Sequence, residues 1–265
     1  MLNETQTKDV EKLFELGAHL GHKKNRLHPK ARKNVYQMIN GTSIIDLTKT
    51  IIQLEEAKKY LKEQAKNGKK MLVVGTKKSA NTFIREFGDK NKISYIATKW
   101  LPGLLTNFTN INKNVTKLKE QMEFVETEEF KNLVKHERTK MQKHIAKLQR
   151  LYSGILNMDK KPDLLLIVDI KKEKNAVKEA LYYKIPIVAI ADTNGDPSTV
   201  TYPIVANDDD TTVVEYIMKQ LLESFVSAIE EPKKEAPKKE EPSKKEESAK
   251  KEEPAIKEKE VKTKK

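Results

Sequence analysis

Cysteine is absent from this sequence of 265 residues. Neither a disulfide framework nor a thiolate metal site is therefore possible. No hydrophobic run approaches the roughly 20 residues that span a bilayer, and the N-terminus lacks the basic start and apolar block of a secretory signal. These absences favour a cytoplasmic protein with no membrane partner.

Acidic residues are missing between Glu15 and Asp46, and the densest run of positive charge lies in this gap. The cations there have no local acidic partner of the kind that stabilises a charged helix surface, and Pro29 prevents one continuous helix. This pattern favours a polyanion as partner, with a solvated basic loop as the alternative. The side chains predicted to bind it are His22, Lys23, Lys24, Arg26, Lys30, Arg32 and Lys33.

The net charge of +13 is unevenly distributed along the chain. Residues 1–105 carry 21 Lys or Arg against 10 Asp or Glu, whereas residues 162–229 carry 6 against 11. A basic half and an acidic third favour docking of one face on a polyanion, with another face left free.

Apolar strands alternate with helices over most of the chain. The strands are rich in β-branched residues and lack polar alternation, which indicates burial on both faces. We expect strands at Met71–Val74, 93–97, Leu164–Val168, Ile187–Ala191 and 204–206, and helices at 5–16, 46–67, 78–87, 173–183 and from a cap at Asn207 or Asp208 to about 229. This order predicts an α/β fold, flavodoxin-like or Rossmann-like, with a mainly parallel sheet between helices. Asn40-Gly41 predicts an added β-hairpin.

One segment departs from this rhythm. Ile111, Val115, Leu118, Met122 and Val125 follow a heptad spacing, and a second series from Val134 to Ile155 continues it after a turn at 126–128. Two such series predict a protruding antiparallel coiled-coil hairpin, with ordinary helices packed on the domain as the alternative. We therefore expect an α/β domain at 1–105 and 158–229, the hairpin at 106–157, and a disordered Lys/Glu/Pro-rich tail at 230–265.

Several local patterns resemble ligand sites but have simpler interpretations. Gly75 lies between a strand and a helix, beside Lys77 and Lys78, yet neither common phosphate-binding glycine motif is present. We interpret Gly75 as a close packing position, with both lysines available to a polyanion. His19, His22 and His28 could bind zinc, but their surroundings are basic, so we predict no metal.

Two acidic stretches could hold Mg²⁺, at 192–197 and at 207–210, but Asn-Gly, Asp-Pro and helix-cap chemistry explain them. No catalytic constellation accompanies them, so we predict neither an enzyme nor a cofactor. Residues 99–107 contain the sole tryptophan, Trp100, which could stack on a base or fill a domain junction.

Five motifs together resemble the family of bacterial small ribosomal subunit protein number two. They are A-H-L-G-H at 18–22, V-G-T-K at 74–77, K-W-L-P-G-L-L-T-N at 99–107, I-P-I-V-A-I-A-D-T-N-G-D-P at 185–197 and A-N-D-D at 206–209. The resemblance implies an α/β domain with a coiled-coil hairpin, bound to small-subunit ribosomal RNA near the head–body junction. It also implies neighbouring ribosomal proteins as partners, including ribosomal protein one.

The resemblance adds Lys77, Lys99, Trp100 and Asn107 to the predicted RNA-binding residues, and Lys78 is included for its charge. Three positions depart from the family pattern: an aromatic is common where Leu27 stands, a glycine at Pro102 and an arginine at Lys99. The predicted function is thus a non-catalytic constituent of the small ribosomal subunit in the cytoplasm. A nucleotide-dependent enzyme acting at Gly75 and Asp192, and a cytosolic coiled-coil adaptor, are the alternatives.

Overall fold

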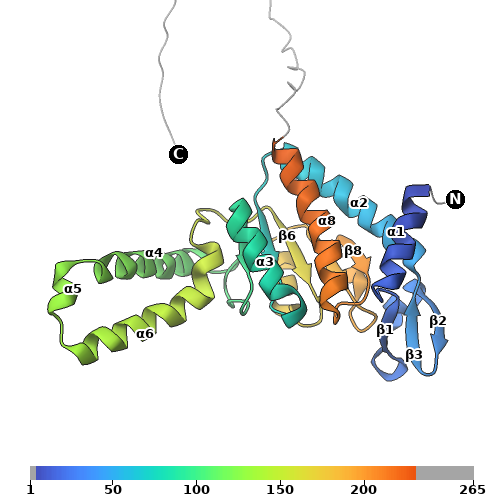
Figure 1. Ribbon diagram of the computed structural model, residues 1–265. Helices are drawn as coiled ribbons and strands as arrows, with labels where there is room; N and C mark the ends of the chain where they lie inside the picture. The colour runs from blue at the N-terminus through green and yellow to red at the C-terminus, as the bar shows by residue number, and fades with distance from the viewer. Residues whose placement is uncertain (1–3, 231–265) are drawn as a thin grey trace, which may run out of the picture. The chain divides into compact units, whose positions relative to one another are not determined.

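A five-stranded parallel sheet forms the centre of the computed structural model, which describes residues 4–230 (Figure 1). The predicted tail lies outside the described residues, except for Glu230. The strand order is β5-β4-β6-β7-β8. The strands are β4 (Met71–Val74), β5 (Ser94–Ile96), β6 (Leu164–Val168), β7 (Ile187–Ala191) and β8 (Tyr202–Val205). The α/β class and the parallel sheet are therefore confirmed.

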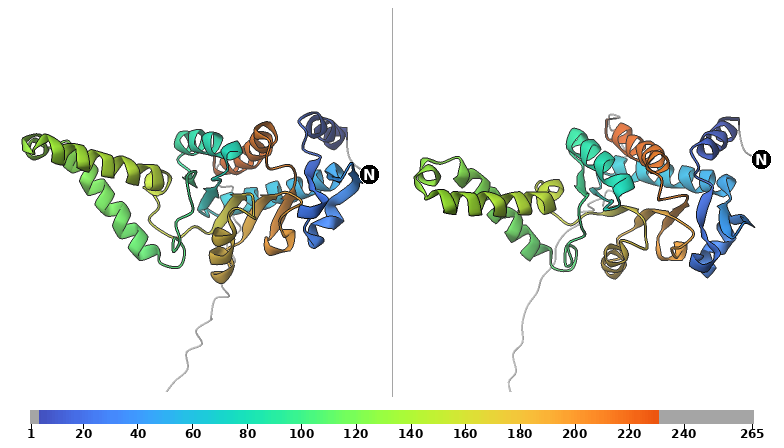
Figure 2. Two further views of the ribbon diagram at one scale, coloured as in Figure 1. Left: turned by 90° about the horizontal axis from the view of Figure 1, so that it is seen from below. Right: turned by 60° about the horizontal axis from the view of Figure 1, so that its bottom comes forward.

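Helices cover both faces of this sheet (Figure 2, left). Leu164, Leu166 and Val168 of β6 join one apolar core, and Leu165 and Ile167 join the other, because alternate side chains of a strand point to opposite faces. The first core includes α1 (Glu4–Glu15), α2 (Leu47–Lys66), α3 (Lys78–Asn91) and α8 (Thr211–Glu230). The second core includes α7 (Lys174–Tyr182).

A small antiparallel sheet lies beside the N-terminal helix, in the order β1-β3-β2. Asn40 and Gly41 both have positive φ, at 49° and 78°, and form the predicted hairpin turn between β2 and β3. The elements here are β1 (Leu20–Lys23), the 3₁₀ helices η1 (Lys24–Arg26) and η2 (Pro29–Asn34), β2 (Val35–Ile39) and β3 (Thr42–Ile45). The basic residues between Lys23 and Lys33 therefore lie on the end of β1 and on two 3₁₀ helices, which the sequence did not predict.

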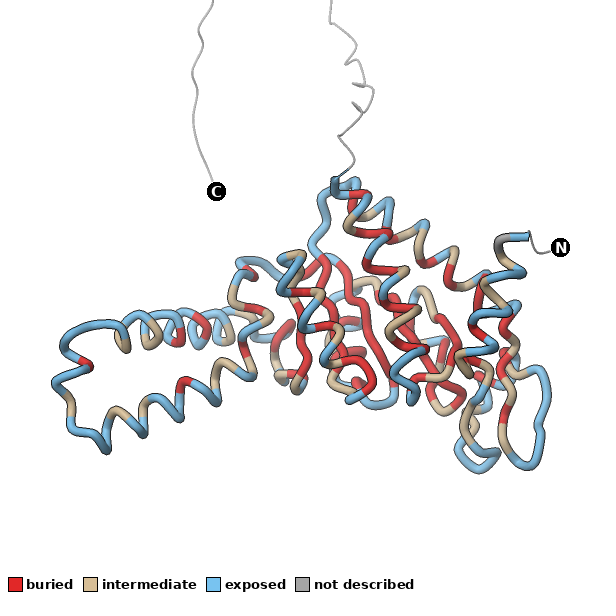
Figure 3. Tube along the Cα trace, in the orientation of Figure 1, coloured by how far each residue is buried: buried red, intermediate tan, exposed pale blue. Residues whose placement is uncertain are grey.

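A helical segment between β5 and β6 extends away from the sheet (Figures 1 and 3). It consists of α4 (Phe108–Val125), α5 (Glu128–Asn132), α6 (Lys135–Tyr152) and η3 (Ser153–Ile155). The expected turn is present at 126 and 127, but it leads into the short helix α5, which buries Phe130 and which the sequence did not predict. Val134 is 69% exposed and so is not part of an apolar seam. Val115, Leu118 and Ile145 are buried in the second core, whereas coiled-coil winding stays a prediction.

The last helix begins later than expected. The side chain of Asp210 accepts a hydrogen bond from the backbone N–H of Thr212, so Asp210 caps α8. The predicted cap at Asn207 or Asp208 is therefore wrong. None of the helices within residues 4–230 combines the length and apolarity that crossing a bilayer requires.

Candidate nucleic-acid interface

The loop that follows β7 holds the basic segment, residues 17–36, in place. The backbone N–H of His28 donates to the Thr193 carbonyl at 2.9 Å, and the N–H of His22 donates to Thr193 Oγ1 at 2.9 Å. Lys30 Nζ lies 2.8 Å from Asp196 Oδ2. These contacts join residues more than 160 positions apart and fix an otherwise irregular segment.

All six predicted lysines and arginines of this segment are exposed to solvent, and five of them form no ion pair with a described residue: Lys23, Lys24, Arg26, Arg32 and Lys33. Among residues 4–230, none of the five lies within 4.0 Å of a carboxylate oxygen. Their side chains are therefore open to an external polyanion. Arg26 also acts within the chain, because a hydrogen bond from Lys77 and, more weakly, the charge of Arg26 lower the pKa of Asp209. Lys30 differs, because it is engaged by Asp196 and Ser198, contrary to the expectation that all of these cations lack partners.

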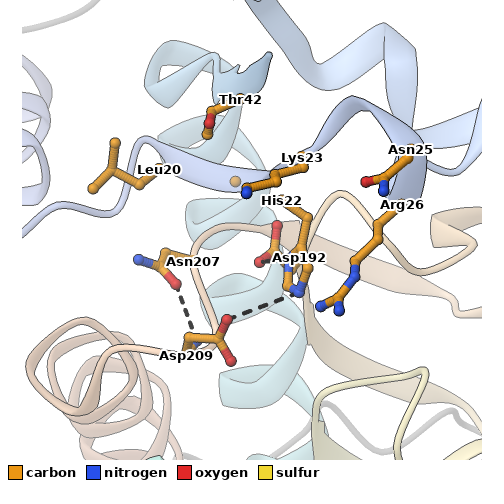
Figure 4. Close-up of a pocket in the computed structure, with 10 residues that line it drawn as sticks. Leu20, His22, Lys23, Asn25, Arg26, Thr42, Asp192, Asn207 and Asp209 are labelled. Atoms are coloured by element: carbon orange, nitrogen blue, oxygen red, sulfur yellow. Dashed lines mark hydrogen bonds and ion pairs between the residues drawn. The ribbon is translucent and has the colours of Figure 1, made fainter. Parts of the chain in front are cut away.

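His22 lies in a pocket of about 560 Å³ at the carboxyl ends of the strands (Figure 4). Its Nδ1 lies 2.6 Å from Asp192 Oδ2, and its Nε2 lies 3.8 Å from Asp209 Oδ2. Burial raises the pKa of Asp192, and hydrogen bonds from Thr193 and His22 oppose this rise. His22 is thus directed toward carboxylates of its own chain, and its role as an RNA ligand stays a prediction.

His22, Asp192 and Asp209 also form the one group of potential metal-ligating side chains within the described part of the chain, with ligand atoms within 4.8 Å of one another. Imidazole and carboxylate ligands suit zinc and similar divalent ions. The hydrogen bond between His22 and Asp192 already pairs the buried carboxylate without an ion. The alternative set of His19, His22 and His28 is not brought together.

Lys77, which follows β4, is enclosed by acids that follow the carboxyl ends of β6 and β8. Its Nζ lies 2.6 Å from Asp208 Oδ1, 2.6 Å from Asp209 Oδ1 and 3.7 Å from Asp169 Oδ2. Burial, followed by the charge of Asp169, raises the pKa of Asp208 to about 7, although Lys77 opposes the rise. Lys77 is therefore directed toward carboxylates of its own chain, and its predicted contact with RNA stays a prediction. Lys78, the next residue, is exposed.

Gly75 has the packing role expected of it. A Cβ there would lie 2.2 Å from Ile84 Cδ1 and 3.2 Å from Ala80 Cβ, so the helix after β4 packs directly on this glycine. A nucleotide phosphate would meet the carboxylates around Lys77 at this strand end, so the site is poorly suited to a nucleotide.

Trp100 is buried, with 5% of its surface exposed, and its Nε1 donates to Glu179 Oε1 at 3.0 Å. The backbone N–H groups of Gly103 and Leu105 donate to the same carboxylate, at 2.9 and 3.0 Å. Partial burial alone would raise the pKa of Glu179, but these hydrogen bonds hold it below its usual value. The buried indole favours the packing interpretation over base stacking, and a contact of Trp100 with RNA stays a prediction.

Lys99 and Asn107 are exposed on either side of this loop, beyond the end of β5. The basic segment instead contacts residues that follow β7, and β5 and β8 are opposite edges of the sheet. The predicted residues therefore do not converge on one site. Glu179, which organises the Trp100 loop, carried no signal in the sequence, because its partners lie more than 70 residues away.

Comparison with known proteins places these observations in context. The family model described as Ribosomal protein S2 matches residues 13–228. The small ribosomal subunit protein uS2 of Dictyoglomus thermophilum is 39% identical over 86% of this chain and 92% of its own length. The uS2 proteins of Coprothermobacter proteolyticus and Fusobacterium nucleatum are 38% and 37% identical, over 83% and 85% of this chain and 82% and 94% of their own lengths.

Proposed function

Because the chain belongs to the ribosomal protein S2 family, we propose that it binds small-subunit ribosomal RNA through its basic segment. Proteins of this family are non-enzymatic constituents of the small ribosomal subunit, so the chain serves translation in the cytoplasm in a structural role. The observation that carries the proposal is the set of five exposed cations in residues 23–33 that lie farther than 4.0 Å from every carboxylate oxygen of the described residues.

The basic segment is suited to phosphates more than to bases. The deep, narrow major groove of an A-form helix hides the base edges, so lysine and arginine side chains contact its backbone and read its shape. Hydrogen bonds from His22 and His28 to Thr193 hold the segment before RNA arrives. Less conformational entropy is then lost on binding than a free basic arm would lose.

Three further parts of the proposal rest on the family resemblance and on the sequence pattern. Lys78, Lys99 and Asn107 are peripheral contacts to RNA. Residues 106–157 form a coiled-coil insertion in the α/β domain made by 1–105 and 158–229. The protein lies near the head–body junction beside other ribosomal proteins, with ribosomal protein one as a candidate neighbour.

The salt dependence of binding tests the role of the basic segment. Five phosphate contacts give a slope of log affinity against log salt of about −4, and Lys23→Ala/Lys24→Ala/Arg26→Ala should make it shallower by two to three units, roughly 0.7 to 0.9 per contact. The RNA is in vitro transcribed small-subunit ribosomal RNA, and filter binding gives the affinities.

The matched control removes three exposed lysines that lie outside the basic segment, on α2 and α8, as Lys59→Ala/Lys62→Ala/Lys219→Ala. It lowers the net charge by the same amount but should leave the slope unchanged. Equal slopes for the two triple variants would show that general charge, and not the basic segment, determines binding.

A further inference from the structure

The C-terminal end of α7 exposes a cluster of large side chains on the surface. Leu181, Tyr182 and Tyr183 are 51%, 76% and 38% exposed, and Tyr182 is the most exposed large apolar side chain among residues 4–230. The helix lies on the face of the sheet opposite α3 and α8 (Figure 2, left). The three residues are therefore not part of the basic segment described above.

The tyrosine pair is held in a defined arrangement. The hydroxyl of Tyr183 donates to the Thr106 carbonyl at 3.4 Å, and Lys161 Nζ lies 3.8 Å from the centre of the Tyr183 ring. The Tyr182 ring meets Tyr183 edge to face, with centroids 5.2 Å apart and planes at 82°. Tyr183 thus fixes the position from which Tyr182 projects into solvent.

Positive charge lies on the segments that carry or contact this pair. Four exposed lysines lie on the same segments, at positions 160, 161, 178 and 184. Lys178 is four residues before Tyr182 and so shares its side of the helix. The nearby carboxylates are largely engaged, because Glu179 is bound to the Trp100 loop and Asp163 lies 3.4 Å from Lys69 Nζ. Asp159 alone is exposed without an ion pair among the described residues here.

An exposed aromatic ring among lysines fits single-stranded RNA better than a protein. Unpaired bases stack on aromatic side chains while nearby cations contact the phosphates. Lysine, by contrast, is depleted from protein–protein interfaces. We propose that the end of α7 is a second RNA contact, at which an unpaired base stacks on Tyr182 and Lys178 and Lys184 meet adjacent phosphates. The partner class, RNA, rests on the proposed function.

The test compares full-length variants at Tyr182 by fluorescence anisotropy. The probes are a fluorescein-labelled single strand of twelve adenosines and a twelve-base-pair RNA duplex. Tyr182→Ala should weaken binding of the single strand by about fivefold or more, because one stacked base contributes at least about that factor. Tyr182→Phe should bind within about twofold of the parent, and Tyr182→Leu, which keeps apolar bulk without an aromatic face, should resemble Tyr182→Ala. Duplex affinity should not change.

The outcomes separate this inference from the proposed function. Equal single-strand affinities for the parent and Tyr182→Ala would overturn it, as would full affinity of Tyr182→Leu or an equal loss on the duplex. The Lys23→Ala/Lys24→Ala/Arg26→Ala variant tests the basic segment independently. If its salt slope is unchanged while Tyr182→Ala loses single-strand binding, the basic-segment proposal fails and the α7 contact stands.

Discussion

Replacing Glu179 with alanine should lower the free energy of unfolding by about 3 kcal/mol, since a buried donor left unsatisfied costs about 1 to 3 kcal/mol. Four N–H donors lose their acceptor: Trp100 Nε1 and the backbone N–H groups of Gly103, Leu105 and Thr106, at 2.9 to 3.3 Å. The Thr106 N–H is exposed, so water can replace the carboxylate there and the cost comes from the other three. Trp100 and Leu105 are buried, so water cannot replace the carboxylate at their positions without rearrangement of the loop. The low end of the range applies to each donor because Glu179 itself is partly exposed.

Urea unfolding followed by tryptophan emission measures this change directly, because Trp100 is the only tryptophan in the chain. Glu179→Gln keeps one acceptor oxygen and should lose roughly half as much stability as Glu179→Ala. Glu223→Ala is the control, since Glu223 is exposed on α8 and makes only a weak pair with Lys219 at 3.9 Å. If Glu179→Ala costs no more than Glu223→Ala, the carboxylate does not hold the Trp100 loop and the reasoning fails.

Lys77→Met should lower the free energy of unfolding in urea by about 3 kcal/mol, because it leaves the buried Asp208 carboxylate without its counter-ion. The control is Lys78→Met at the next, exposed position, which should lower it by less than about 0.5 kcal/mol. Equal losses of stability in the two variants would contradict this interpretation. Slight burial would raise the pKa of Asp196, but hydrogen bonds from Lys30 and Ser198 lower it to about 2. A carboxyl group whose pKa is lower in the folded protein than in the unfolded chain stabilises the fold at pH values above its unfolded pKa of 3.8. This contribution is lost as the pH falls toward 2. The Tm difference between the parent and Asp196→Asn, followed by circular dichroism, should therefore be constant above about pH 5 and shrink between pH 4 and 2; a difference independent of pH would exclude this ion pair.

The elements with strong local signals could be predicted from the sequence. The three central strands Met71–Val74, Leu164–Val168 and Ile187–Ala191 have the expected bounds, because continuous apolar runs mark strands buried on both faces. Helix α2 lies within one residue of expectation, since Asp46 caps it and Gly68 follows its end. The hairpin at Asn40-Gly41 follows from two residues that readily adopt positive φ.

The side-chain environments could not be predicted, because they depend on partners distant in sequence. Lys77 meets Asp208 across 131 residues, and Trp100 meets Glu179 across 79. No local pattern shows that a given lysine is neutralised or that a given indole is buried. Only the parallel sheet, which gathers the carboxyl ends of β4, β6 and β8 at one edge, brings Lys77 and its acids together.

The acidic third of the sequence, residues 162–229, does not simply form a free face, as its composition suggested. Its carboxylates follow β7 and β8 and lie directly against the basic half, where Asp192 pairs with His22 and Asp196 with Lys30. Some basic side chains therefore form contacts that attach the basic segment to the sheet. The cations at positions 23, 24, 26, 32 and 33 are exposed and form no such ion pair. A lysine counts toward RNA affinity only if no carboxylate of its own chain has already replaced the phosphate. The expected salt slope thus follows from the exposed, unpaired cations and not from the total charge of the segment.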